Sequence, residues 1–202
     1  MRFTTMGVSI TIVTMAVIIS TIYLLQNPLQ WTNTQPKIGG PFKLINQHGN
    51  RVSDKTFLNN YVVVFFGFTH CPDICTTALQ TVTKTLESLG EEAKKINIIF
   101  VTVDPIRDTP QILKKYLSHF DKRIIGLTGS QKEISEMIRN FRAYARKVKN
   151  NNFPNNYTVD HSTFLYLLGP NGKFITHFAH HTPHKKIKTR ISIEMQKSAK
   201  AT

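Results

Sequence analysis

The two cysteines of the chain, Cys71 and Cys75, are the residues best suited to carry chemistry. On a helix, positions i and i+4 share a face, so both sulfurs can reach one point. The corresponding Cα separation of about 6 Å also lies within the range that a disulfide requires. Two cysteines are too few for a disulfide framework. The pair therefore indicates metal binding or redox chemistry.

The sequence around the pair, GFTHCPDIC at residues 67–75, predicts where it lies. An uninterrupted apolar run at residues 61–66 is typical of a strand buried on both faces. Pro72 suits the first turn of a following helix, where unpaired N–H groups favour thiolates. Sites in α/β sheets gather at the carboxyl ends of strands. A functional site is therefore favoured over the alternative of two small buried apolar residues.

The identity of a metal follows from the number of thiolates. Structural zinc usually takes four protein ligands, whereas two thiolates with one imidazole suit copper, whose cuprous form is soft. The chain has eight histidines, so composition alone leaves the imidazole open. His70 is interpreted as a structural or supporting residue. A histidine cluster near the C-terminus is interpreted as a strand end and a loop; its members are His177, His180, His181 and His184.

The elements that must position the cysteines alternate between strand and helix. Their order, β-α-β-α-β-α-β-β-α, predicts an α/β fold with a mixed sheet, one edge of which a final hairpin makes antiparallel, as in thioredoxin-like folds. After the first strand, the apolar spacing and end signals predict helices near 78–89, 109–119, 130–145 and 185–195, and strands at 96–103, 123–127, 163–168 and 173–178.

The N-terminal residues 7–25 contain no charge or proline. About nineteen residues at 1.5 Å each span roughly the 30 Å core of a bilayer, and no signal-peptidase pattern follows them. We expect an uncleaved membrane anchor at 1–25, a tether at 26–40 and a folded domain at 41–200. Arg2 precedes the apolar run and no other Lys or Arg follows until Lys37, which predicts an exported domain.

The net charge of +14 is concentrated towards the C-terminus. From Arg139 onward twelve Lys and Arg residues face only Asp160 and Glu194. Such a surface suits anionic lipid or an acidic protein, and we exclude nucleic acid because no nucleic-acid motif accompanies the charge.

Four segments together resemble the Sco family, also called SenC: FGFTHCPDIC at 66–75, VTVDPIRDTP at 101–110, YTVDHST at 157–163 and LGPNG at 168–172. The resemblance covers about residues 38 to 195. It implies a thioredoxin-like fold and one copper ion bound by Cys71, Cys75 and His161. The last of these lies where thioredoxin-like enzymes carry a cis-proline, and this chain has no proline there, which favours metal binding over disulfide exchange.

The resemblance also implies a function. The chain is expected to be a copper chaperone, not an enzyme, that delivers copper to the dinuclear copper site of a cytochrome c oxidase subunit. The location would be the bacterial inner membrane with the domain in the periplasm, or equivalently the mitochondrial inner membrane facing the intermembrane space. Asp104, Asp108 and Asp160 are expected to support the metal site or contact the partner, although Asp108 also suits an ordinary helix start.

Three alternatives use the same cysteines. A thiol–disulfide reductase would reduce the copper-site cysteines of the oxidase through a mixed disulfide formed and resolved by the Cys71–Cys75 pair. A copper or redox sensor needs no different residues. A peroxiredoxin-type peroxidase is disfavoured because no Pro-x-x-x-Thr-x-x-Cys pattern leads to Cys71.

Overall fold

The computed structural model divides the chain into two units, Met1–Pro36 and Lys37–Thr202. Its description covers residues 4–26, 37–149 and 157–200, with the backbone alone for residues 4–12.

The first unit contains one helix, α1 (Thr4–Gln26), which covers the segment predicted as a membrane anchor. Among the residues that the structure describes, no helix is long and apolar enough to cross a membrane. The side chains of residues 7–12 lie outside this description, as does most of the predicted tether at 26–40, namely residues 27–36. Anchor and tether stay predictions.

The second unit is built on a seven-stranded mixed sheet in the order β2-β1-β5-β4-β3-β8-β9. The three central strands β3, β4 and β5 are parallel, and the other pairings are antiparallel. The strands are β1 (Lys43–Asn46), β2 (Arg51–Ser53), β3 (Tyr61–Gly67), β4 (Ile96–Thr102), β5 (Ile124–Thr128), β8 (Phe164–Leu168) and β9 (Phe174–Ala179).

Both edges of this sheet are antiparallel, whereas the sequence predicted one. The β8–β9 hairpin is the predicted edge. The second edge is the β1–β2 hairpin, which the sequence analysis missed because its strands have only four and three residues and are mostly half-exposed. Strands this short carry too little alternation to be recognised.

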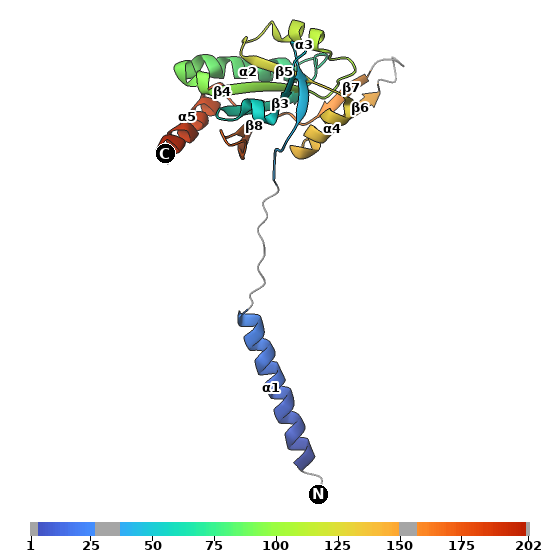
Figure 1. Cartoon of the computed structure of the whole chain (residues 1–202), viewed down its shortest axis with the longest axis vertical. Coiled ribbons are helices and arrows are strands. Elements are labelled where there is room, and N and C mark those ends of the chain that lie inside the picture. The colour runs from blue at the N-terminus through green and yellow to red at the C-terminus, as the bar shows by residue number, and fades with distance from the viewer. Residues whose placement is uncertain (1–3, 27–36, 150–156, 201–202) are drawn as a thin grey trace. The chain divides into compact units, whose positions relative to one another are not determined.

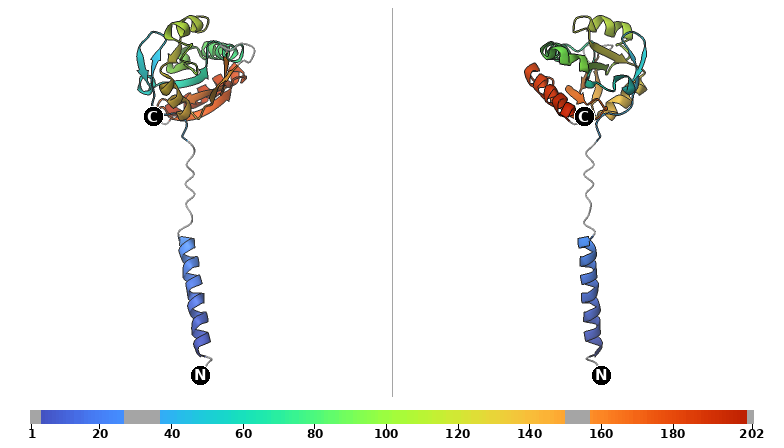
Figure 2. Two further views of the ribbon diagram at one scale, coloured as in Figure 1. Left: turned by 90° about the vertical axis from the view of Figure 1, so that its right-hand side faces the viewer. Right: turned by 60° about the vertical axis from the view of Figure 1, so that its left-hand side comes forward.

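Helices cover both faces of the sheet because every residue of β3 is buried. Alternate β3 side chains belong to two separate apolar clusters, one on each face. The first face is covered by α2 (Ile74–Leu89), α3 (Pro110–Leu117) and α5 (His184–Lys200). The second face is covered by α4 (Gln131–Asn140) and the short helix η1 (Asp54–Phe57). A further short helix, η2 (Gly90–Lys95), leads into β4. Helices α2 and α5 pack side by side, as Figures 1 and 2 show.

A separate two-stranded ribbon, formed by β6 (Ala145–Lys149) and β7 (Tyr157–His161), lies beside α4 (Figure 1). The helix predicted to reach residue 145 ends at Asn140 instead. Arg142 has φ of 51°, a left-handed conformation that cannot continue a helix. His161 was expected to lead directly into the strand predicted at 163–168, but it ends β7. This ribbon brings the C-terminal motif back to the sheet.

Candidate metal centre

The two cysteines flank the junction between β3 and α2, as the sequence predicted. Cys75 lies in the first turn of α2 and is fully buried, whereas Cys71 precedes the helix and is half-buried. The last residue of β3, Gly67, allows the backbone to pass close to the sulfur. A Cβ there would lie 2.6 Å from the Phe100 ring and 2.9 Å from the Cys75 Sγ. Any side chain at this position would displace the thiol.

The loop before the cysteines is held by the Asp108 carboxylate, which is fully buried. It accepts hydrogen bonds from the backbone N–H of Thr69 at 3.0 Å and from the Thr69 hydroxyl at 2.6 Å. The Thr102 hydroxyl at the end of β4 donates a third bond at 2.6 Å. Asp108 therefore ties the segment that leads to Cys71 to the centre of the sheet.

His161 approaches the cysteines from the ribbon. Its Nδ1–H donates to the Ser162 carbonyl oxygen at 2.9 Å, so Nε2 is the ring nitrogen that faces the thiols. Nε2 lies 3.7 Å from the Cys75 Sγ. The ring edge packs against Phe68, with centroids 5.7 Å apart, and against Phe65 at 6.5 Å. The hydrogen bond and the aromatic contacts orient the free ring nitrogen towards the thiols.

Cys71, Cys75 and His161 thus form one group, in which all three ligand atoms lie within 4.8 Å of one another. Within the described ranges it is the only set of three or more His, Cys, Asp or Glu side chains that converges in this way. The segments that supply it are 86 residues apart in the chain. Two sulfurs and one imidazole suit a soft ion of low coordination number such as cuprous copper. They lack the fourth ligand of a closed zinc site.

The two thiols share one proton. The pKa of Cys71 is lowered to about 4, chiefly because the Cys75 side chain hydrogen-bonds to its thiolate. Burial of Cys71 raises the pKa, but hydrogen bonds from His161 and from the backbone of Cys75 and Asp73 lower it further. The pKa of Cys75 is raised, because it keeps the shared hydrogen bond and because it is desolvated. Cys71 is therefore the ionised, accessible thiolate, and Cys75 is its buried donor.

Asp104, which the sequence analysis placed beside the site, is fully buried and joins the ribbon to the sheet. Its carboxylate pairs with the Arg107 guanidinium and accepts hydrogen bonds from the Tyr157 hydroxyl at 2.8 and 3.0 Å. Arg107 also stacks on the Tyr157 ring at 3.9 Å and donates to its carbonyl oxygen at 3.0 Å. Lys147 lies 3.9 Å from Asp104 and 4.5 Å from the centre of the Tyr157 ring. We call Asp104, Arg107, Lys147 and Tyr157 the ribbon clasp.

The sequence analysis missed Arg107 and Tyr157, although both lie inside the family-like segments at 101–110 and 157–163. Their contact depends on the ribbon, which it did not predict. Asp160 is exposed, and strand alternation turns its side chain away from the side of β7 that carries His161. Asp160 lies outside the metal-binding group, and so do Asp104 and Asp108.

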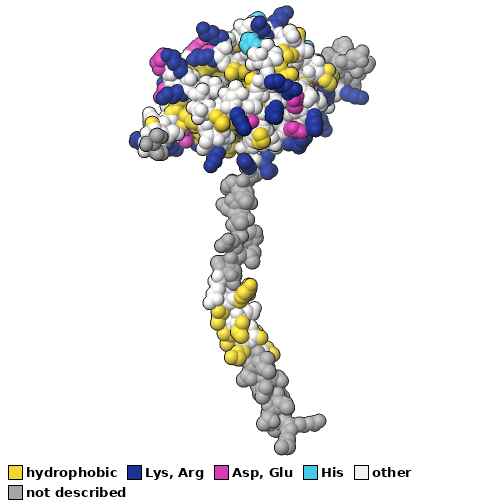
Figure 3. Space-filling view, viewed as in Figure 1, with side chains coloured by type: hydrophobic (Ala, Val, Ile, Leu, Met, Phe, Trp, Pro, Cys, Tyr) yellow, Lys and Arg dark blue, Asp and Glu magenta, His cyan; other side chains and the backbone are white. Residues whose placement is uncertain are grey.

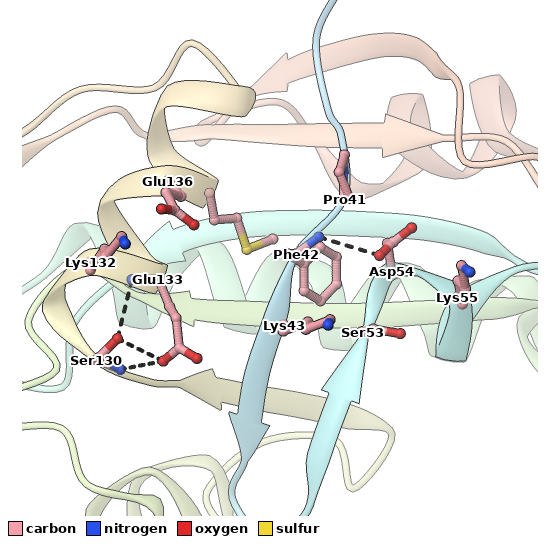
Figure 4. A pocket seen from close by; sticks show the side chains of 11 residues that line it. Pro41, Phe42, Lys43, Ser53, Asp54, Lys55, Ser130, Lys132, Glu133 and Glu136 are labelled. Atoms are coloured by element: carbon pink, nitrogen blue, oxygen red, sulfur yellow. Dashed lines mark hydrogen bonds between the residues drawn. The ribbon is translucent and has the colours of Figure 1, made fainter.

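Larger hollows elsewhere do not resemble a metal site. A groove of about 700 Å³ between β1, β2 and α4 is lined by charged side chains of both signs and by Phe42 and Met137 (Figure 4). None of its lining residues is a cysteine or a histidine. Its Glu133 caps α4, and the Arg51 guanidinium lowers the pKa of that carboxyl to about 2. Glu133 of the groove is thus already engaged by Arg51, which is not among the lining residues.

Comparison with known proteins agrees with this geometry. The family model described as SCO1/SenC matches residues 30–196. An SCO2-like protein of Rickettsia prowazekii is 41% identical over 142 residues, which make up 70% of this chain and 69% of that protein. Bradyrhizobium japonicum ScoI with copper bound has a TM-score of 0.72 at 40% identity, covering 77% of this chain and 98% of that one.

A further solved structure is that of BsSco, described as having a disulfide switch and as a member of the Sco family of cytochrome c oxidase assembly proteins. It has a TM-score of 0.63 at 29% identity and covers 81% of this chain and 96% of that one. These likenesses confirm both the resemblance and the thioredoxin-like α/β fold with a mixed sheet that the sequence predicted. The chain belongs to the SCO1/SenC family.

Proposed function

We propose that this protein carries copper for the assembly of cytochrome c oxidase and passes it to the subunit that bears the dinuclear copper site. The observation that carries the proposal is the convergence of Cys71, Cys75 and His161 within 4.8 Å. Structures of relatives from Bradyrhizobium japonicum and from yeast are described as having copper bound, and BsSco is described as belonging to a family of oxidase assembly proteins.

The unequal exposure of the ligands suits a carrier. Copper would be shielded on the side of Cys75, which is fully buried, while Cys71 and His161 are both half-buried and Cys71 lies on the loop before α2. An incoming thiolate from an acceptor can therefore reach the ion on the Cys71 side and replace the ligands one at a time. Such ligand exchange requires no bond to be made or broken in a substrate, so the protein acts as a carrier rather than an enzyme.

Location and charge would bring carrier and acceptor together. We infer that residues 1–25 anchor the chain in the bacterial inner membrane with the second unit in the periplasm, which raises the effective concentration of a membrane-bound acceptor. Lys and Arg side chains are spread over the face of the second unit that Figure 3 shows. This charge would steer an acidic acceptor. Association rates that do not change with ionic strength would contradict the steering.

The test is copper retention and delivery by the full-length chain, comparing wild type, His161→Ala and His70→Ala. His70 is the matched control because it neighbours Cys71 but lies outside the metal-binding group. We expect one tightly held cuprous ion in wild type and in His70→Ala, and at least a tenfold weaker ion in His161→Ala. Delivery to a soluble oxidase domain should fall in parallel. Equal retention by all three proteins would overturn His161 as a ligand.

A second candidate, reduction of the oxidase's copper-site cysteines, is favoured by the low pKa of Cys71, because a half-exposed thiolate beside a protonated thiol is the attacking form in disulfide exchange. His161→Ala separates the two functions, since reductase turnover should survive the loss of a metal ligand.

The pKa of about 4 itself predicts that Cys71 is a thiolate throughout pH 5 to 8. Its alkylation rate in the metal-free protein should change less than about twofold over that range. An ordinary thiol with a pKa of about 8.5 would react roughly tenfold faster for each added pH unit. Mass spectrometry after brief labelling gives the rate at each cysteine, and a tenfold rise per pH unit at Cys71 would contradict the assignment.

A further inference from the structure

Two adjacent histidines, His180 and His181, lie on the turn that connects β9 to α5. The turn is closed by a hydrogen bond from the Thr182 N–H to the Ala179 carbonyl oxygen at 2.9 Å. The function proposed above does not use this pair. We call His180 and His181 the outer histidine pair.

The sheet register places the outer histidine pair at the same end of the strands as the metal-binding group, namely the end where β3 finishes. Phe65 near the end of β3 pairs with Leu165, and Phe164 at the start of β8 pairs with Ala179 at the end of β9. His180 therefore follows β9 two strands away from the carboxyl end of β3. With strands about 4.8 Å apart, its backbone lies roughly 10 Å from that end.

Strand alternation also places His180 on the same face of the sheet as the thiols. Phe178 and Leu165 pair with each other and pack in the apolar cluster that contains Cys75. His180 is two residues after Phe178, and Thr163 is two residues before Leu165. The His180 Nδ1 and the Thr163 hydroxyl share a hydrogen bond of 3.1 Å, which shows that both side chains lie on one side.

The segment after His161 holds both imidazoles in the same manner. The Ser162 carbonyl oxygen engages the Nδ1 of His161, and the next residue, Thr163, engages the Nδ1 of His180. The Ser162 carbonyl can only accept, so Nδ1 of His161 carries the proton. In His180 the same tautomer, with Nδ1–H donating to the Thr163 hydroxyl, leaves Nε2 able to bind a metal. Histidines that bind metals usually have their second ring nitrogen fixed by such a hydrogen bond, which orients the ring. His180 is therefore oriented as a ligand by the chain segment that orients His161.

His181 offers a second imidazole beside that of His180. The ring centroids of His180 and His181 are 5.0 Å apart and the rings are nearly perpendicular, at 85°. Two imidazoles that each bind one ion at about 2 Å need centroids about 6 Å apart, a separation within reach of the exposed His181 side chain by rotation. Imidazole is a suitable ligand for copper.

We propose that the outer histidine pair binds a second cuprous ion and passes it to Cys71, Cys75 and His161. The binding site stands independently, while the transfer rests on the function proposed above. In the transfer the two Cu–N bonds to the pair break as bonds to the Cys71 and Cys75 sulfurs and to the His161 nitrogen form. Cys75 releases its proton to water, and copper keeps its oxidation state. No oxidant or reductant is needed.

The first experiment titrates the full-length chain with cuprous ion against a chromophoric chelator. Wild type should bind one tight and one weaker equivalent. His180→Ala/His181→Ala should keep the first and weaken the second at least tenfold. The control, His48→Ala/His119→Ala, removes two exposed histidines that lie elsewhere and should change neither. A second equivalent retained by the His180/His181 variant, or absent from wild type, would overturn the site. If the wild-type protein showed no tightly bound first equivalent, the proposed function would be overturned instead.

A Cys71→Ser/Cys75→Ser variant isolates the outer site. Its single cuprous ion should show nitrogen ligands and no sulfur by X-ray absorption. Should that variant fail to fold, Thr163→Val in the wild-type background gives the same information. It removes the hydroxyl that orients His180, so the second equivalent should weaken about tenfold with the first unchanged. An unchanged second equivalent in Thr163→Val would contradict the orienting role.

Transfer is tested by the rate at which the metal-binding group fills from a cuprous chelate. Loading of the thiolates, followed by their charge-transfer absorption, should be at least fivefold slower in His180→Ala/His181→Ala, with the final affinity unchanged. An unchanged loading rate would show that the outer pair binds copper without feeding the thiolates and would overturn the transfer step.

Discussion

The cysteine loop at residues 67–75 and the β6–β7 ribbon each supply part of one metal-binding group, but they are held in place differently. The loop lies between the parallel strands and α2, where Asp108 accepts three hydrogen bonds. Gly67 lies so close to the Cys75 sulfur that no side chain would fit between them. The strands of the ribbon pair only with each other. The ribbon meets the sheet through the buried Val159 side chain and through the ribbon clasp, three of whose four members are partly exposed.

This difference assigns separate tasks to the two regions. Changes in the loop act on the apolar core, so they should affect stability and metal binding together. Changes in the ribbon clasp act on a polar attachment, so they should loosen His161 while leaving the thiols in place. The two kinds of ligand can therefore be separated by mutation.

The largest effect is expected from Gly67→Ala. The new methyl group would overlap the Phe100 ring and the Cys75 sulfur, lowering the free energy of unfolding by about 2–3 kcal/mol and weakening copper binding at least a hundredfold. The matched control is Gly126→Ala on β5, where a Cβ would lie 2.5 Å from a Leu117 methyl group. It should lose similar stability and keep copper. Urea unfolding and copper titration measure both, and equal copper loss in the two variants would break the distinction.

Arg107→Ala tests the ribbon clasp. The substitution leaves the buried Asp104 carboxylate without its closest cation and removes the stacking on Tyr157. We therefore expect the free energy of unfolding to fall by about 2–3 kcal/mol. Hydrogen exchange followed by mass spectrometry should quicken in β6 and β7. Exchange in β3 and β4 should stay as in wild type. Uniform quickening throughout the sheet would mean that the ribbon is not a separately held region.

Tyr157→Phe is the gentler version of the same test. It removes the hydroxyl that donates to Asp104 and keeps the ring on which Arg107 stacks, so it should cost about 1 kcal/mol. Copper affinity should fall a few-fold. Asp160→Asn, on the opposite side of the same strand, should change neither quantity by a measurable amount. If Asp160→Asn weakened copper binding as much as Tyr157→Phe, the ribbon clasp would have no special role.

The loop was predictable from sequence, and the ribbon was not, for physical reasons. The run at 61–66, the glycine after it and the helical spacing after Pro72 are local signals, so the strand, the turn and the helix could be placed from a few residues each. The β6 strand, ARKVK, carries three cations in five residues and has no buried face to reveal it. Its partner lies beyond residues 150–156, so the pairing depends on a contact that no local pattern encodes.

The candidate site shows the same division. Spacing and position identified Cys71 and Cys75, because both lie on one short segment. His161 was identified mainly from the resemblance to a family, with support from the missing proline, since seven other histidines compete and its approach to the thiols depends on the unpredicted ribbon. Asp104 and Asp108 were predicted to support the metal site or contact the partner, and that role stays a prediction; their separate contacts, one with the ribbon and one with the loop, could be seen only in three dimensions.

X-ray absorption of the singly loaded protein in the cuprous state tests the central claim most directly. The account predicts two sulfur ligands and one nitrogen ligand in wild type, from Cys71, Cys75 and His161. It predicts the loss of that nitrogen in His161→Ala, with both sulfurs retained. A nitrogen signal of unchanged intensity in His161→Ala would contradict the claim that the ribbon supplies the third ligand.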